Sequence, residues 1–452
     1  MTLRPMVRHG SLAVALLSAL TLPLIARAGA FQLPTDNAAG WARADAGGSL
    51  FPDDPTAAYN NPAAMAFFTG SMFQVTGIQI RPSAVFHGQT QDVDGNPTTG
   101  GNPNGFGKFV PFPNVAWAVP VTDRLTLGGA LTVPFGLESQ YNSSWRGRYF
   151  GTETYLETAN LSFSAAFKLN DQFSLGLGVL GQYTKASLDT VADPYGAAQA
   201  LFGLPLPPQQ ADVQLNVNAR RKFSFGYLGG LVYKPTDQDT FGISYHSRID
   251  QTLSGSYNLY GSTAGKQLLA EAPLLDPALP SINPNGGPIS AVFDTPAFAS
   301  ADWLHAFTDR LSIAATIKRT QWSSFQDLVL TSNGQTIFAL PERFKNSMTY
   351  AVGGDYKLSD AWTLHAGVGF DETPTNVADR DPRVPDADRK LLGLGLGYKV
   401  SEKLSFDVGY QHEFVNNARV NMTNQPILGA GSINGYFTDT GDILSLTGTY
   451  RF

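Results

Sequence analysis

Long stretches of this sequence alternate between apolar and polar residues with a period of two. The clearest examples are residues 161–169, 392–399, 404–411 and 444–452. In the third of these, Leu404, Phe406 and Val408 are separated by Ser405 and Asp407. Such alternation places one face of a β-strand in an apolar medium and the other in a polar one. Many segments run for about ten residues or more, which suits tilted strands that cross a membrane.

The first 28 residues have the three parts of a secretory signal peptide. Arg4 and Arg8 form a positive start, residues 11–25 are mostly apolar, and Ala26-Arg27-Ala28 is a cleavage site of small residues. No later segment offers 18 uninterrupted apolar residues. Because a helix needs about that many to span a bilayer, any membrane-spanning part is expected to consist of β-strands.

A short turn pattern recurs along the chain, in which Asp, Asn or Glu precedes a new alternating segment. It occurs at residues 122–127, 170–175, 237–241, 308–313, 359–364 and 401–406. Between these turns lie connections that are mostly longer, near residues 87–112, 136–153, 191–210, 258–289, 332–334, 373–387 and 423–438. Short turns on one side and long loops on the other are typical of outer-membrane barrels. The count predicts an all-β fold, a fourteen-stranded antiparallel transmembrane β-barrel in the bacterial outer membrane.

Composition excludes several other classes of protein. With 31 basic and 37 acidic residues, the chain of 452 residues has a net charge of −6 and no basic footprint for nucleic acid. It contains no Cys, which excludes disulfides and thiolate metal sites. The G-x-G-x-x-G match at residues 176–181 lies inside a predicted strand, where a nucleotide-binding loop cannot form. We therefore expect no cofactor and no bound metal.

Residues 29–70 do not alternate and precede the first predicted strand. This stretch is too small for a core of its own. It could be a disordered periplasmic tail or a plug inside the barrel, as larger barrels often have. Its five large aromatic residues favour the plug because they need burial: Trp41, Phe51, Tyr59, Phe67 and Phe68. The predicted organisation is a signal peptide (1–28), an N-terminal hatch (29–70) and a barrel (71–452).

Several motifs, in this order, resemble the FadL/TodX family of outer-membrane transporters of hydrophobic compounds. They are Gly29-Ala30-Phe31-Gln32-Leu33, Asp53-Asp54 with Asn61-Pro62-Ala63, Trp145-Arg146-Gly147-Arg148-Tyr149, Leu156-Glu157-Thr158-Ala159-Asn160-Leu161, Phe344-Lys345-Asn346, Gly369-Phe370-Asp371-Glu372-Thr373-Pro374 and Pro385-Asp386-Ala387-Asp388-Arg389. The resemblance covers essentially the whole mature chain. It implies a monomeric barrel whose lumen is closed by a hatch carrying Asn61, Pro62 and Ala63.

The resemblance also implies a function, which is passive uptake without catalysis. Long-chain fatty acids or similar hydrophobic compounds would enter from outside and leave sideways through a gap in the wall. Aromatic hydrocarbons are the alternative ligand within the same family, and a surface barrel acting as adhesin or receptor is a further alternative. Expected partners are the ligand, outer-membrane lipid and lipopolysaccharide, and the barrel-assembly machinery during insertion.

Two predicted external loops are unusually apolar and are candidates for ligand capture. Exposed apolar surfaces of this kind mark interaction sites, although the two loops could instead pack on each other as a lid. The residues concerned are Leu201, Phe202 and Leu204 in one loop and Leu268, Leu269 and Leu274 in the other.

The third predicted strand, residues 125–135, contains a proline that is unusual in a closed barrel. Proline cannot donate to the ladder and belongs at edges or bulges. Pro134, Phe135 and Gly136 are therefore candidates for a lateral opening, and the family's inward kink lies in the corresponding strand. Simple termination of the strand at the external rim is the alternative.

A fatty-acid carboxylate would need a cation in the pocket. Matching to the family's head-group cations points to Lys185 and Lys345. Lys345 shares the parity of lumen-facing Ser347. Lys185 has lipid-facing parity, so it would turn inward only if a β-bulge near Gly181 shifted the register. Either lysine could instead lie at the rim and meet lipopolysaccharide phosphate.

Two other clusters are interpreted as structural. Ser244 and His246 lie two apart on one strand, which raises the possibility of a lipase, but their parity predicts a lumen position without an orienting carboxylate. Residues 379–389 crowd acidic and arginine side chains together. Oxygen ligands could hold Ca²⁺ there, but the arginines favour a network of ion pairs.

Overall fold

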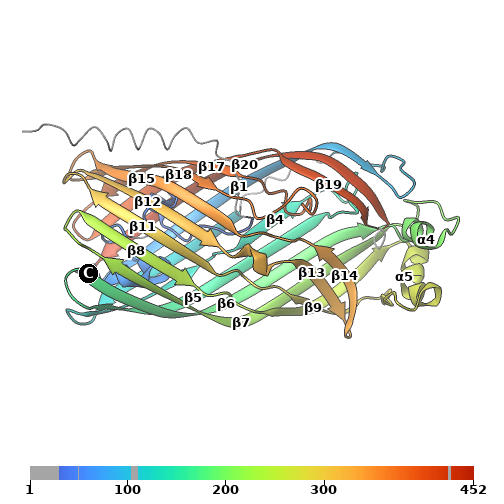
Figure 1. Ribbon diagram of the computed structural model, residues 1–452, viewed down its shortest axis with the longest axis horizontal. Helices are drawn as coiled ribbons and strands as arrows, with labels where there is room; N and C mark the ends of the chain where they lie inside the picture. The colour runs from blue at the N-terminus through green and yellow to red at the C-terminus, as the bar shows by residue number, and fades with distance from the viewer. Residues whose placement is uncertain (1–29, 49, 103–109, 426–428) are drawn as a thin grey trace, which may run out of the picture.

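The computed structural model describes residues 30–48, 50–102, 110–425 and 429–452. Within these residues the strands close into a fourteen-stranded antiparallel barrel (Figure 1). The first strand, β1 (Met72–Gln91), pairs with both the second strand and the last, which closes the wall. The predicted fold class is confirmed. The predicted signal peptide, residues 1–28, lies outside the described residues.

Several of the fourteen strands are interrupted and therefore carry two labels. After β1 the wall consists of β2 (Val110–Pro120), β3 (Leu125–Thr132) with β4 (Gly136–Gln140), β5 (Glu153–Lys168), β6 (Phe173–Ala192), β7 (Val213–Tyr233), β8 (Asp239–His246) with β9 (Thr252–Gly261), β10 (Gly287–Val292) with β11 (Phe298–Ala306), β12 (Leu311–Thr320) with β13 (Asp327–Ser332), β14 (Gln335–Pro341) with β15 (Ser347–Lys357), β16 (Trp362–Asp371), β17 (Arg389–Lys399), β18 (Leu404–Val415) with β19 (Ala418–Gln425), and β20 (Ala430–Arg451). The helical elements are α2 (Ala38–Ala42), α3 (Ala57–Asn60), η2 (Pro62–Phe67), α4 (Pro194–Phe202), α5 (Thr263–Leu275) and η3 (Trp322–Ser324).

All six predicted short turns join neighbouring strands at one end of the barrel. Five of them close with the same pair of backbone hydrogen bonds. At one, the N–H groups of Val121 and Thr122 both donate to the carbonyl of Leu125, at 2.8 and 3.1 Å. The first and last strands meet at this end too, because the N–H of Phe452 donates to the carbonyl of Ser71, which precedes β1. This end is therefore the short-turn, periplasmic end.

The strands extend further on the opposite, external side than the sequence predicted. Residues 430–438 belong to β20, and residues 136–140 form β4. The predicted loops at 423–438 and 136–153 were therefore too long. Alternation weakens beyond the membrane because both faces of a strand meet protein or water there, so the period-two signal is lost while the hydrogen-bonded ladder continues.

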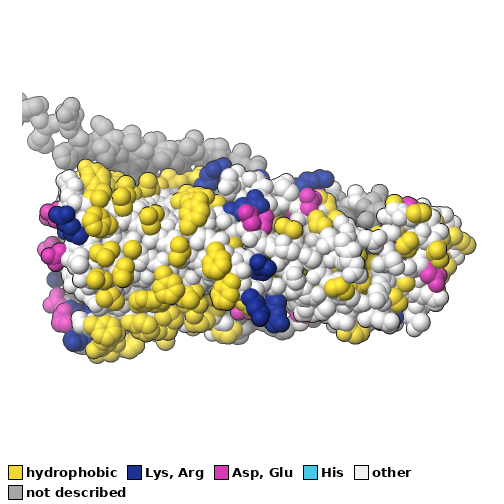
Figure 2. Space-filling view, turned by 90° about the horizontal axis from the view of Figure 1, so that it is seen from below, with side chains coloured by type: hydrophobic (Ala, Val, Ile, Leu, Met, Phe, Trp, Pro, Cys, Tyr) yellow, Lys and Arg dark blue, Asp and Glu magenta, His cyan; other side chains and the backbone are white. Residues whose placement is uncertain are grey.

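The alternating side chains divide between the outer surface and the lumen. On β18, Phe406, Val408 and Tyr410 are exposed on the outer surface, whereas Gln411 is buried. On the face shown in Figure 2, a yellow band of apolar side chains covers the half of the barrel near the short turns. Charged side chains lie along the short-turn border of this band. This is the pattern of a barrel that faces lipid.

Residues 30–71 precede β1, and the part up to residue 66 is mostly buried. The glycines of β17 that alternate with leucines make room for α2. A Cβ added to Gly393 would lie 2.3 Å from the carbonyl oxygen of Ala42, and one on Gly409 would lie 2.1 Å from that of Ala38. The N-terminal segment therefore lies inside the lumen, against a part of the wall where glycines leave room for its backbone.

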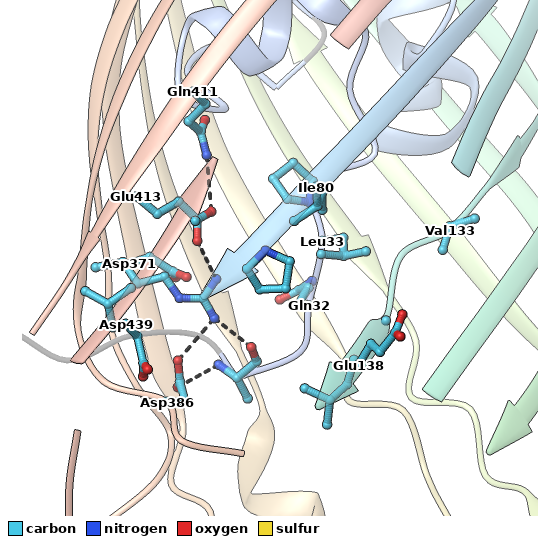
Figure 3. A pocket seen from close by; sticks show the side chains of 18 of the residues that line it. Gln32, Leu33, Ile80, Val133, Glu138, Asp371, Asp386, Gln411, Glu413 and Asp439 are labelled. Carbon is cyan, nitrogen blue, oxygen red and sulfur yellow. Dashed lines mark hydrogen bonds and ion pairs between the residues drawn. The ribbon is translucent and has the colours of Figure 1, made fainter. Parts of the chain in front are cut away.

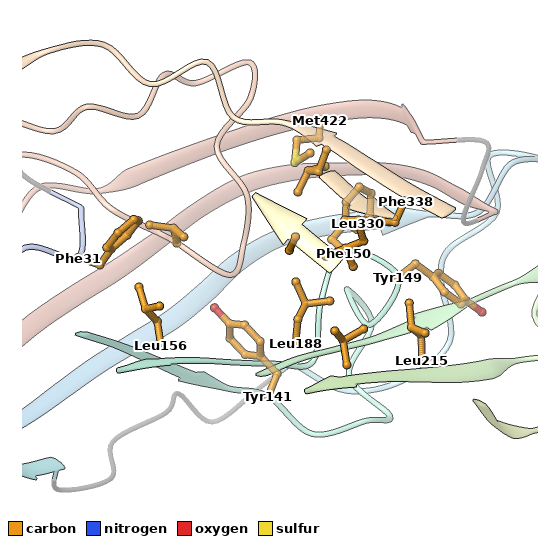
Figure 4. Close-up of a cluster of buried hydrophobic side chains, with 14 of the residues drawn as sticks. Phe31, Tyr141, Tyr149, Phe150, Leu156, Leu188, Leu215, Leu330, Phe338 and Met422 are labelled. Carbon is orange, nitrogen blue, oxygen red and sulfur yellow. The ribbon is translucent and has the colours of Figure 1, made fainter. Parts of the chain in front are cut away.

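The external half of the barrel is filled by a cluster of buried apolar side chains (Figure 4). Phe31 of the N-terminal segment belongs to this cluster, and its ring centre lies 4.6 Å from that of Trp322. Among the described residues, no helix is long and apolar enough to cross a membrane.

Candidate functional site

The third barrel strand is broken between β3 and β4, and the N-terminal segment fills the break. Pro134 has no N–H to give to the ladder. Its carbonyl accepts a hydrogen bond of 2.9 Å from the N–H of Leu33, and the N–H of Gly136 donates to the carbonyl of Phe31 at 3.0 Å. Gln32 and Phe135 form an antiparallel bridge between these two bonds. Three residues of the N-terminal segment thus act as a short extra strand at the break.

Pairing between the second and third barrel strands ends at this break. On β2 and β3 the last pair on the external side is Val115 with Leu131. Beyond it β4 pairs only with β5, starting at Gly136 and Glu157. Within the described residues, no ladder joins β2 to β4. The wall therefore has a gap on the external side of the break.

A cavity of about 320 Å³ lies beside this gap (Figure 3). On the side of the gap it is lined by the N-terminal segment, β1, β2, the break, β4 and β5, and elsewhere by residues 384–386 and by β12, β15, β16, β17, β18 and β20. On β5 the lining includes Tyr155, Leu156 and Glu157. Because successive residues of a strand point to opposite faces, the cavity meets both faces of the wall here. The cavity is therefore lined by residues from both faces of the wall beside the break.

The apolar lining suits a hydrophobic ligand. The apolar residues come from the N-terminal segment, which includes Trp41 of α2, and from strands of the wall. The apolar members are Ala30, Leu33, Pro34, Trp41, Ile80, Pro82, Ala84, Pro111, Phe112, Pro113, Val133, Leu137, Leu156, Val384, Pro385, Leu391 and Val415. A largely apolar lining with a few placed polar groups is typical of small-molecule sites.

The charges around the cavity are arranged in ion pairs. The Arg389 guanidinium contacts Asp386 and Glu413, each at 3.1 Å, and also donates to the carbonyl of Ala30 at 2.6 Å. The N–H of Ala30 in turn donates to Asp386 at 2.9 Å. Arg389 thereby fixes the start of the N-terminal segment to β17 (Figure 3).

A second pair joins the N-terminal segment to β12. The Lys318 ammonium contacts the Asp45 carboxylate. Burial raises the pKa of Asp45, but Lys318 and a hydrogen bond with Asp36 together lower this pKa overall. The described lining holds two cations and seven acids, namely Lys318 and Arg389 against Asp45, Glu138, Glu157, Asp371, Asp386, Glu413 and Asp439. The cavity is therefore negative overall.

The predicted hatch residues lie against the lumen wall of β6 to β8. Asn61 is fully buried, and its amide donates to the carbonyl of Ile243 at 3.3 Å. Its side-chain oxygen accepts from the N–H of Ala63 at 3.2 Å, which caps η2. A Cβ added to Gly176 would lie 2.2 Å from the backbone nitrogen of Ala63 and 2.5 Å from the carbonyl carbon of Pro62. The hatch motif thus fits a glycine-lined surface.

Comparison with known proteins assigns the family. The model of the family described as "Outer membrane protein transport protein (OMPP1/FadL/TodX)" matches residues 19–452. The chain belongs to this family. It is accordingly a β-barrel of the bacterial outer membrane.

Relatives and solved structures agree with the assignment. The chain is 26% identical to the long-chain fatty acid transport protein of Escherichia coli K12 over 410 residues, which covers 86% of this chain and 89% of that one. It is 27% identical over 423 residues to outer membrane protein P1 of Haemophilus influenzae, with 86% of each covered. A crystal structure of a Pseudomonas aeruginosa FadL homologue is 40% identical and superposes with a TM-score of 0.90, covering 94% of this chain and 100% of that chain.

Of the two lysines predicted to bind a head group in this FadL/TodX barrel, neither lines the 320 Å³ cavity. Lys185 is exposed on the outer surface of β6, 5.2 Å from the ring centre of Tyr155. A β-bulge is present, as expected, but the extra residue is on β7. The alternation of inward and outward side chains along β6 is therefore unchanged. The structure therefore corrects the placement of Lys185 in the pocket.

Lys345 lies in a separate, more external cavity of about 440 Å³, together with Arg380, Asp388 and Arg419. Its N–H donates to the carbonyl of Pro374 at 2.9 Å. The cations that do line the cavity at the gap, Lys318 and Arg389, were missed as ligand candidates. The sequence pattern could have indicated that Lys318 faces the lumen, because it shares the parity of Ala314, Thr316 and Thr320. All three of these residues are buried in the structure.

The two predicted capture loops carry helices at the external tip. Leu201 and Phe202 end α4, and Leu204 follows it after Gly203, whose φ of 65° ends the helix. Leu268, Leu269 and Leu274 lie on α5, where Leu274 is 82% exposed. The two helices contact each other and lie beyond the strands (Figure 1). The two loops thus pack on each other and still leave apolar side chains exposed to the outside.

The remaining clusters take structural roles. Ser244 and His246 are buried in the lumen, as predicted, and the His246 ring nitrogen Nε2 lies 2.8 Å from the carbonyl oxygen of Tyr59. The acidic loop forms the expected ion pairs, which include Arg383 with Asp381 and Arg343 with Asp379. Among the described residues no group of acids and histidines is arranged to hold a metal ion.

Proposed function

We propose that this barrel takes up long-chain fatty acids or similar hydrophobic compounds and releases them sideways through the wall gap at Pro134–Gly136. The observation that carries the proposal is the cavity that meets both faces of the wall beside the break. A hydrophobic ligand leaving there enters the apolar part of the membrane without crossing water. The relatives named as long-chain fatty acid transport proteins support the same ligand class.

The path begins at the exposed leucines of α4 and α5, which collect ligand from outside. It continues to the cavity, where the N-terminal segment, acting as the hatch with Asn61, Pro62 and Ala63, closes the way to the periplasm. Lys318 and Arg389 are placed to meet a carboxylate. The ligand would do so by displacing an acid from one of the existing pairs, since buried charges require partners.

The negative lining favours a second candidate ligand, an aromatic hydrocarbon. Seven acids against two paired cations disfavour an anion more than a neutral molecule. Binding of oleate and toluene to the purified barrel separates the two candidates. Tighter binding of oleate supports the fatty acid, and preference for toluene supports the hydrocarbon.

Blocking the gap tests the proposed route. Leu137 lines the cavity on β4, so Leu137→Trp should fill the opening and reduce oleate uptake by cells that lack their own transporter. Leu161 lies on the outer surface of β5, and Leu161→Trp is the matched control. Uptake that survives Leu137→Trp in a folded barrel would exclude this exit. The protein is expected to act as a monomer without catalysis, and to depend on the barrel-assembly machinery for insertion.

A further inference from the structure

A β-bulge on β7 exposes an unusual run of cations on the outer surface. In the pairing of β6 with β7, Gln182 faces Ser224 but Thr184 faces Arg221, so β7 carries one extra residue. Up to this point odd-numbered residues of β7 face inward, and beyond it even-numbered ones do. As a result, Arg220, Arg221, Lys222 and Phe223 are four consecutive exposed residues. A bulge re-aims side chains in this way.

A fourth cation comes from the neighbouring strand. Lys185 of β6 is paired directly with Arg220 of β7. We call Lys185, Arg220, Arg221 and Lys222 the basic patch. Within the described residues, none of these four side chains forms an ion pair. Glu157 faces Lys185 across the sheet, but its carboxylate accepts a hydrogen bond from Tyr155. The four cations thus face one acid, Glu157, across the sheet, and the patch carries a net positive charge.

The basic patch lies at the external border of the apolar band. On the short-turn side, the next outward residues of β7 are Phe223, Phe225 and Tyr227, all strongly exposed. On the other side, Asn218 is exposed and polar. Figure 2 shows Lys and Arg side chains gathered where the yellow band gives way to the mostly polar external part. Aromatic residues mark the membrane interface, so the patch lies at head-group level in the outer leaflet.

Clustered like charges on neighbouring strands are unfavourable unless a counter-charge relieves them. The outer leaflet of this membrane supplies such a charge in the phosphates of lipopolysaccharide. Arg and Lys are suited to phosphate, and the exposed rings below them would pack on acyl chains. We propose that the basic patch binds the phosphorylated lipid A part of lipopolysaccharide. The patch borders the proposed exit, since Lys185 lies beside Tyr155, but its binding of phosphate does not depend on which ligand is transported.

The test measures binding of bisphosphorylated lipid A to the intact, detergent-purified barrel. The variant combines Lys185→Gln, Arg220→Gln and Lys222→Gln. Each cation near a charged lipid surface contributes about 1 kcal/mol, so affinity should fall about a hundredfold. The matched control neutralises three exposed cations at the short turns, with Arg124→Gln, Arg310→Gln and Lys403→Gln, and should keep wild-type affinity.

Two further measurements test whether binding depends on the positive charges of the patch and on the phosphates of the lipid. The charge-preserving variant with Lys185→Arg, Arg220→Lys and Lys222→Arg should bind lipid A within a few-fold of wild type, and heat-modifiable migration in electrophoresis verifies that every variant is folded. Lipid A without phosphates should bind weakly to the wild type. Unchanged affinity in the neutralised variant, equal binding of dephosphorylated lipid A, or equal binding of phosphatidylglycerol would each overturn the proposal.

Discussion

The N–H of Leu33 donates a 2.9 Å hydrogen bond to the carbonyl of Pro134, so the N-terminal segment completes the barrel wall at its break. Each such bond contributes only about 0.5–1.5 kcal/mol net. The closure consists of two backbone bonds, one buried ring and the contacts of Ala30 with Asp386 and Arg389, all of them non-covalent and able to reform after opening. Opening at this point would connect the lumen to the membrane without unfolding the barrel.

Phe31 is predicted to be the main anchor of this closure. It is buried against several rings, and its centre lies 5.9 Å from that of Phe293 and 4.6 Å from that of Trp322. Phe31→Ala should cost about 3–5 kcal/mol, mostly as local detachment of the N-terminal segment. Hydrogen exchange of residues 30–36 should then become much faster. Phe225→Ala, on the outer surface, is the control and should leave this exchange unchanged.

Gly176 is predicted to be essential for seating the hatch. A Cβ there would lie 2.2 Å from the backbone nitrogen of Ala63. Gly176→Val should displace the hatch and raise permeability to small polar antibiotics, while the folded barrel still reaches the membrane. Gly77→Val is the matched control, since a Cβ at Gly77 meets no atom within 4 Å. Equal antibiotic sensitivity in both variants would show that the hatch does not rest on Gly176.

The Lys318–Asp45 pair should behave as a coupled unit. Lys318→Met leaves a buried carboxylate without its partner, which typically costs about 3–5 kcal/mol. Adding Asp45→Asn should recover most of this loss, because no buried charge remains. Thermal unfolding of the two single variants and the double variant measures the coupling. Additive losses would mean that the two side chains do not interact energetically.

Much of the fold was predictable because alternate residues of a strand face lipid and the polar lumen, which requires apolar and polar side chains in turn. Leu394 and Val408 face lipid, as their parity predicts. The turns were predictable for a local reason, since each uses side chains such as Thr122 to accept from the backbone; Leu125 N–H donates to its hydroxyl at 3.0 Å. The glycines between the leucines of β17 could also be seen in the sequence. What requires them is the approach of α2, a tertiary contact that the sequence does not show.

The site was only partly predictable. Pro134 marked the break because a missing N–H is a property of the residue itself. The partners that fill the break, Phe31 and Leu33, lie about a hundred residues away in sequence, and no local pattern joins them to it. The bulge was expected near Gly181, but it is on β7, and a strand's own sequence does not show which side of a pair carries the extra residue. Because the extra residue is on β7, the side chain of Lys185 remains on the outer surface of the barrel.

Lys345 remains a prediction for binding of the head group, now at the external cavity rather than at the gap. Lys345→Ala should weaken binding of oleate by about tenfold, the size of one charged contact, and should leave binding of toluene unchanged. Equal losses of affinity for both ligands would exclude a role of Lys345 in binding the carboxylate. Binding titrations with the detergent-purified barrel provide the measurement.

The most direct test locks the N-terminal segment to the break. Gln32 and Phe135 form an antiparallel bridge, for which the Cα separation of about 4.5–5.5 Å suits a disulfide, and the chain has no other Cys. Val352→Cys with Val368→Cys, paired on the outer surface of β15 and β16, is the control disulfide.

Oleate uptake is measured for Gln32→Cys with Phe135→Cys before and after oxidation. The account predicts that oxidation abolishes uptake, that a reductant restores it, and that the control disulfide has no effect. Undiminished uptake through the fully oxidised barrel would contradict lateral release through the break at Pro134.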